Sequence, residues 1–210
     1  MNDATAATPD PLAALRAATD AQHELLDRSL PLSKDGATLA DYRQHLLMLR
    51  AWLGPLNEWL ARYSDGAQDG ALVPPRDYLS LIDLDLADRA MAGLPPPVLP
   101  AAPQTGDTAP WPAGADAAYR WGVCYVVEGS QLGGAVLYKR LSGALAPHPL
   151  SYLRGAAQAA LSAEPAPGPG PRWKAFVAAL RQALLTPDDV RAASLGAVDA
   201  FEHLMALRAQ

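Results

Sequence analysis

Trp121-Gly-Val-Cys-Tyr-Val-Val-Glu-Gly-Ser-Gln-Leu-Gly-Gly134 is the stretch of sequence that decides the fold class. It lies inside an apolar segment, roughly residues 115–141, whose periodicity is helical. β-Branched residues are too few and too scattered along the chain to indicate a sheet. The sequence therefore predicts an all-α fold with this segment as its central helix.

Proline divides the rest of the chain into helices and spacers. Seven of the 20 prolines fall between Pro95 and Pro112, and four fall between Pro165 and Pro171. Proline removes a helix donor and clashes with the preceding turn, so we predict loops at residues 95–112 and 164–171. We also expect residues 1–9 to be flexible.

Six or seven helices are expected in a single domain, residues 1–210, because no group of helices carries a self-sufficient core. The first helix begins at Asp10-Pro11, an N-cap followed by proline at the first helical position, and ends at Pro31. The second begins at Thr38-x-x-Asp41, which resembles a capping box. The remaining helices are predicted near residues 78–91, 115–141, 151–163, 172–185 and 186–207.

Composition excludes several classes of protein. The net charge of −5 and the pI near 5.3 argue against a general nucleic-acid binder. The single cysteine excludes a disulfide scaffold and any site with several cysteine ligands. No uncharged apolar run reaches the roughly 18 residues of a membrane helix, and no export signal is visible at the start. We therefore expect a cytoplasmic protein that binds neither nucleic acid nor membrane.

His23 is the most informative histidine, because it lies in the middle of the apolar face of the first helix. One interpretation is a buried histidine that bonds to a carbonyl group, which is the more common outcome. The other is a single axial ligand to a planar metal cofactor. The face is formed by Leu12, Leu15, Thr19, His23, Leu26 and Leu30.

Three glycines of the central helix, Gly122, Gly129 and Gly133, project within about 40° of one another. A glycine inside a helix costs roughly 1 kcal/mol relative to alanine, so three on one face need a reason. Tight packing against another helix and close approach of a flat ligand are equally good explanations. Together with His23, the second explanation predicts a macrocycle between two helices, with Arg16 or Arg140 as a cation for its propionates.

Two motifs carry a family likeness. Leu15-Arg-Ala-Ala-Thr-Asp-Ala-Gln-His-Glu-Leu-Leu-Asp27 resembles the proximal helix of bacterial haem oxygenases. Tyr125-Val-Val-Glu-Gly-Ser-Gln-Leu-Gly-Gly134 resembles their distal helix, in the form found in bacteriophytochrome-associated members. The resemblance implies a multi-helical bundle with haem between these two helices.

The resemblance also implies roles for individual residues. His23 matches the proximal iron ligand, while Arg16 and Tyr125 match groups near the haem propionates. Arg140, which extends the glycine stripe, is a further candidate to assist them. The catalytic positions implied on the distal helix are Gly129, Ser130, Gly133 and Gly134. Ser130 stands where animal-type enzymes carry an aspartate.

The activity implied is ring opening of haem with O₂ to biliverdin, CO and Fe²⁺. Electrons would come from an external donor, such as a ferredoxin or a reductase, and a bacteriophytochrome would accept the biliverdin. One alternative is a haem-binding or haem-storage protein without turnover. Another is a non-haem, thiaminase-like enzyme on the same fold, for which Cys124 and Glu128 are the pair on the central helix.

Overall fold

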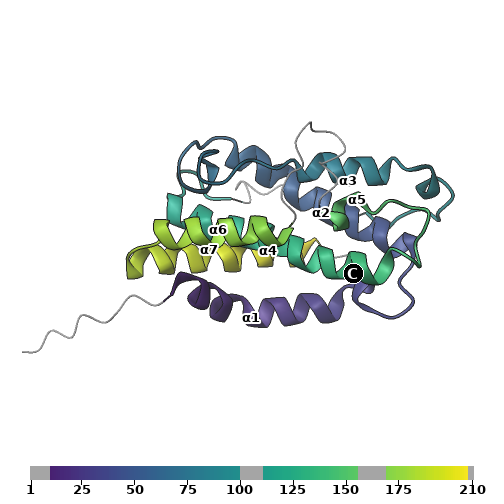
Figure 1. Cartoon of the computed structure of the whole chain (residues 1–210), viewed down its shortest axis with the longest axis horizontal. Coiled ribbons are helices and arrows are strands. Elements are labelled where there is room, and N and C mark those ends of the chain that lie inside the picture. The colour runs from purple at the N-terminus through teal and green to yellow at the C-terminus, as the bar shows by residue number, and fades with distance from the viewer. Residues whose placement is uncertain (1–9, 100–110, 156–168, 208–210) are drawn as a thin grey trace, which may run out of the picture.

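Helix α4 (Ala117–Leu141) is the longest helix of the computed structural model and the one around which the others pack. The structure describes residues 10–99, 111–155 and 169–207. Within these ranges the chain has seven α-helices and no strand, and it forms a single helical body, which confirms the predicted all-α class. In Figure 1, α1 (Pro11–Ser29) runs along one edge, below α4 and α7 (Pro187–Ala206).

The starts of the long helices follow from local capping, as predicted. Helix α2 (Leu39–Leu60) begins with a capping box, in which Thr38 and Asp41 each bond the backbone N–H of the other. Thr186 and Asp189 form the same arrangement at the start of α7, followed by proline at the first helical position. Asp10 precedes α1 but bonds Arg181 instead of capping the helix.

Three predicted boundaries were wrong. The helix predicted at 151–163 ends at Arg154, because Gly155 takes the left-handed conformation that terminates a helix. Helix α3 (Tyr78–Leu86) ends early, because Asp88 caps a separate 3₁₀ turn at Arg89–Met91. Helix α6 (Pro169–Ala183) begins inside the predicted 164–171 loop, because proline is compatible with the first turn of a helix. Residues 95–99 and 111–112 are not helical, as predicted. The segments 1–9 and 164–168, and residues 156–163 of the predicted fifth helix, lie outside the described residues.

The short helix α5 (Ser151–Arg154) is anchored to α3 by a buried carboxylate. Asp85 is fully buried and accepts hydrogen bonds from the backbone N–H groups of Ser151 and Tyr152 and from the hydroxyl of Tyr42. These bonds place an acidic group at the start of α5 and satisfy its free donors. The anchor fixes α5 against α4, where it supports the glycine-rich segment.

Helices α4 and α7 cross closely in the core. A Cβ added to Gly122 would lie 1.7 Å from the carbonyl oxygen of Ala193, and one added to Gly196 would lie 2.1 Å from that of Tyr119. Each glycine therefore lets the backbone of the other helix approach. No helix within the described ranges is long and apolar enough to cross a membrane.

Candidate functional site

Helix α4 meets α1 at one point and the turn that follows α1 at another, and the section between these two points contains the predicted residues. At one point, the Tyr125 hydroxyl of α4 hydrogen-bonds with Thr19 of α1. At the other, the Arg140 guanidinium donates to the carbonyl oxygens of Leu32 and Ser33, just after α1. Tyr125 and Arg140 are about 22 Å apart along α4 at 1.5 Å per residue. Both helices run in the same direction through this section.

The two contacts show which residues of α1 and α4 lie at the same height along the two helices. His23 lies four residues beyond Thr19, and Gly129 lies four residues beyond Tyr125. Because both helices rise equally per residue, His23 and Gly129 lie at the same level, and one turn later Asp27 and Gly133 do. The predicted proximal and distal residues thus lie at the same level along two helices, although His23 packs on Phe201 of α7 and Gly129 faces Trp173 of α6.

His23 is an exposed histidine, with 64% of its side-chain surface accessible. This contradicts the interpretation of a buried histidine bonded to a carbonyl group. Its Nδ1 lies 3.1 Å from a carboxylate oxygen of Asp27, and its ring packs edge-on against Phe201 of α7. When Nδ1–H donates to that carboxylate, Nε2 carries the lone pair, which is the arrangement common among metal-bound histidines.

The glycines of α4 differ in what surrounds them. Gly122 packs against α7 and has no room for a ligand, so the packing explanation is correct there. A Cβ on Gly129 would contact the Trp173 ring at 3.6 Å, and one on Gly134 would contact the Leu153 carbonyl at 3.5 Å. A Cβ on Gly133 would meet no described atom within 4 Å. The glycines of this stripe therefore have different surroundings: Gly122 is packed against α7, whereas Gly133 meets no described atom.

The predicted cations also differ. Arg16 is exposed, and its positive charge acts on the Tyr125 hydroxyl. Burial raises the pKa of Tyr125, while the bond with Thr19 and the charge of Arg16 act in the opposite direction. Arg140 is committed to the two backbone carbonyls after α1. Arg16 and Tyr125 thus form the polar end of the section.

Ser130 is half-buried beside a buried polar contact between α4 and α5. Its hydroxyl donates to the Val127 carbonyl at 2.7 Å, one turn earlier in the same helix. The neighbouring Gln131 amide donates to the Tyr152 hydroxyl at 3.0 Å and lies 3.4 Å from the Ser130 oxygen. Sequence analysis missed Gln131 and Tyr152, because residues 21 positions apart show no common pattern.

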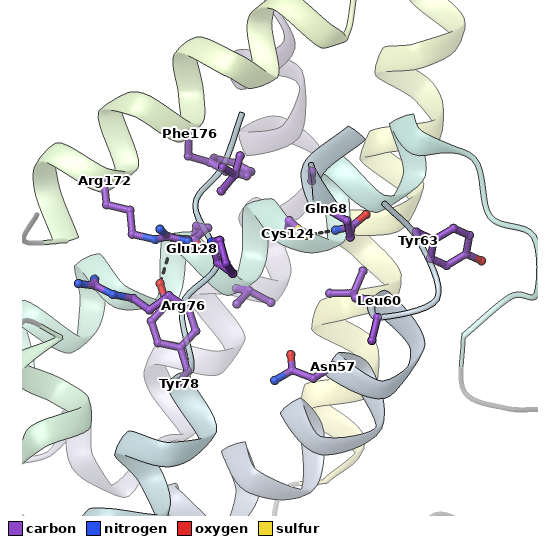
Figure 2. Close-up of a pocket in the computed structure, with 15 residues that line it drawn as sticks. Asn57, Leu60, Tyr63, Gln68, Arg76, Tyr78, Cys124, Glu128, Arg172 and Phe176 are labelled. Atoms are coloured by element: carbon purple, nitrogen blue, oxygen red, sulfur yellow. Dashed lines mark hydrogen bonds and ion pairs between the residues drawn. The ribbon is translucent and has the colours of Figure 1, made fainter. Parts of the chain in front are cut away.

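A second region lies on another face of α4, where a cavity of about 310 Å³ opens between α2, α4 and α6 (Figure 2). Its residues include both members of the pair considered for a non-haem enzyme, Cys124 and Glu128. Glu128 is 7% exposed and receives two hydrogen bonds from Arg172, at 2.6 and 2.7 Å, and one from the Tyr78 hydroxyl at 3.0 Å. Neither Arg172 nor Tyr78 was predicted.

Cys124 is poorly suited to act as a nucleophile. Burial, and then the negative charge of Glu128, raise the pKa of its thiol to about 12, although a hydrogen bond from Gln68 opposes the shift. At neutral pH the thiol is therefore protonated, and the thiolate is the reactive form. In the described part of the chain, no group of three or more metal-ligating side chains occurs.

The other three histidines are packed within the protein or against an aromatic ring. His148 is buried, accepts from the Leu150 N–H at Nδ1 and therefore donates from Nε2 to the Asp85 carbonyl. Burial lowers the pKa of His45 to about 4 and also lowers that of His203, which packs on Trp111.

A comparison of the chain with known protein families and with curated proteins finds no match.

Proposed function

We propose that the chain is a haem oxygenase that opens haem with O₂ and electrons to biliverdin, CO and Fe²⁺. The observation that carries the proposal is the exposed His23–Asp27 pair, which lies level with the glycines of α4. An imidazole oriented by a carboxylate through one ring nitrogen offers the other nitrogen to a metal. The likeness of both helices to haem oxygenase motifs supports the same assignment.

The residues of the section fit haem in three respects. His23 would supply a single nitrogen ligand to the haem iron. A Cβ on Gly133 would meet no described atom within 4 Å, and the nearby Val136 is 69% exposed, so this part of α4 offers an open apolar surface among the described residues. Arg16 and Tyr125 form a polar end suited to carboxylates.

Bound haem would supply the redox-active iron and the ring carbon that is attacked. In our proposal, His23 holds the cofactor through Nε2, and Asp27 keeps the imidazole in the required tautomer. Arg16 and Tyr125 would orient the ring through its propionates, while Gly129, beside the Trp173 ring, and Gly133 would add no side chains of their own to the distal side. Ser130, Gln131 and Tyr152 provide hydroxyl and amide groups behind the glycines.

External proteins complete the proposed reaction. A ferredoxin or a reductase would deliver the electrons, and a bacteriophytochrome would accept the biliverdin. Of the alternatives, the non-haem hydrolase has less support, because the Cys124 thiol is protonated at neutral pH and Glu128 is held by Arg172.

A haem titration of the purified protein tests the proposal first. Wild type should bind haem with a Soret spectrum, and His23→Ala should lose that spectrum while remaining folded, because the side chain is exposed. His203→Ala is the matched control and should bind haem as wild type does. An unchanged spectrum in His23→Ala would contradict the assignment of the iron ligand.

Addition of ascorbate, or of a ferredoxin system, to the haem complex in air tests turnover. The Soret band should be replaced by biliverdin absorbance. A haem complex that persists under these conditions would reject the oxygenase and support the storage protein.

A further inference from the structure

The imidazole of His23 is restrained by contacts rather than by enclosure, because most of its side-chain surface is exposed. Its two side-chain torsion angles decide where the ring nitrogens point. Asp27 restrains the ring through one nitrogen, but this carboxylate lies on the same helix and is itself exposed. An exposed pair of this kind holds two side chains only weakly. A contact from outside α1 would add the restraint that this pair lacks.

Phe201 of α7 makes such a contact. The centroids of the His23 and Phe201 rings are 6.1 Å apart and the ring planes form an angle of 64°, which is an edge-on arrangement. Aromatic pairs favour this geometry over face-to-face stacking, at centroid distances of about 4.5–7 Å. Phe201 is buried, whereas His23 is exposed. The contact therefore joins an exposed ring to one that the core already holds.

The position of Phe201 is fixed by the packing of α7. Two residues earlier, Asp199 accepts a hydrogen bond from the Tyr119 hydroxyl of α4 at 2.7 Å. About one turn before Asp199, Gly196 lets α7 approach α4 so closely that an added Cβ would lie 2.1 Å from the Tyr119 carbonyl oxygen. Helix α7 also packs against α1, which runs below it in Figure 1. Phe201 thus belongs to a part of α7 that contacts both helices of the proposed site.

We propose that Phe201 is a positioning residue for His23, the iron ligand of the proposed function, on which this inference rests. Asp27 determines which ring nitrogen remains available to a metal, and Phe201 limits rotation of the ring. Groups behind a metal ligand commonly orient it in this way. The imidazole is then oriented before haem arrives, so less side-chain entropy is lost on binding.

The chain offers a matched pair of variants, because Phe176 and Phe201 are its only phenylalanines and both are buried. Phe201→Leu removes the ring but keeps an apolar side chain, and Phe176→Leu makes the same change where the ring packs on Trp121 and Trp173. NMR of the His23 ring in the haem-free protein gives the first readout. Phe201→Leu should shift the ring signals and lower the order parameters of the ring C–H bonds, because the ring gains freedom to rotate. Phe176→Leu should change neither. A His23 ring as ordered in Phe201→Leu as in wild type would overturn the proposal.

Haem affinity, measured by titration of the Soret band, gives the second readout. Phe201→Leu should bind haem about two- to tenfold more weakly, the loss expected for one aromatic contact. Phe201→Tyr, which keeps the ring, and Phe176→Leu should bind haem as wild type does. An equal loss in the two leucine variants would show that Phe201 acts only through the packing of the core, and would reject the positioning role.

The same titration separates failure of this inference from failure of the proposed function. Wild type that binds no haem would reject both together. Wild type that binds haem, with Phe201→Leu binding it equally well, would reject the positioning role of Phe201 alone.

Discussion

At Gly122, in the N-terminal half of α4, an added Cβ would lie 1.7 Å from the carbonyl oxygen of Ala193, whereas at Gly133, in the C-terminal half, it would meet no described atom within 4 Å. The first half is packed against α7, and its glycine permits contact between two backbones. The second half lies over the section that contains His23, and its glycine leaves space. Glycine thus permits close packing against α7 in the first half of α4 and leaves space beside the helix in the second half.

The largest effect expected from this comparison is that of Gly122→Ala. The new methyl group would overlap a backbone carbonyl that cannot move without shifting α7, so the loss of stability should exceed about 4 kcal/mol, beyond the usual cost of overpacking. Chemical denaturation monitored by circular dichroism measures it. Gly133→Ala, the same change in the same helix, is the control. A Gly122→Ala protein as stable as wild type would contradict the close α4–α7 crossing.

The packed half also contains the Glu128–Arg172 pair, and Arg172→Met should produce the next largest effect. Loss of the guanidinium leaves a buried carboxylate without its counter-charge, which should cost about 3 kcal/mol, at the lower end of the range because Arg172 retains 11% exposure. Arg181→Met is the matched control, since its pair with Asp10 is about half exposed and its loss should destabilise the protein far less. Equal losses in the two variants would show that Glu128 is not effectively buried.

Features formed by residues close together in the sequence could be predicted, whereas features formed by distant residues could not. Helix starts at Thr38 and Thr186 were predictable, because a capping box is formed by residues three positions apart. The Glu128–Arg172 pair was not, because it joins residues 44 positions apart through the packing of α6 on α4. The helical projection placed Gly122 and Gly133 on one stripe correctly, yet periodicity cannot say which neighbour covers each end of a stripe.

In the open half, Gly133→Ala should increase stability. The methyl group would enter open space and remove the helix cost of glycine, a gain of up to about 1 kcal/mol. The melting temperature of the haem-free protein should therefore rise, while the biliverdin yield of the haem complex should fall, because the new side chain intrudes on the proposed distal side. A lower melting temperature would show that Gly133 is a packing glycine like Gly122.

The smallest effect on stability is expected for Asp27→Asn, a change in α1 beside the proposed iron ligand His23. The His23–Asp27 pair is more than 60% exposed on both sides, so its loss should change stability by less than about 0.5 kcal/mol. Haem affinity should nevertheless fall at least about tenfold, because the amide no longer accepts the Nδ1–H bond as strongly and the imidazole loses its preferred tautomer. Titration of the haem-free protein, followed by the Soret band, gives the affinity. Glu24→Gln, also exposed on α1 but paired with Arg28, is the control and should leave the affinity unchanged. If both variants bind haem as wild type does, Asp27 does not orient the ligand, and the pair that carries the proposed function is only a surface contact.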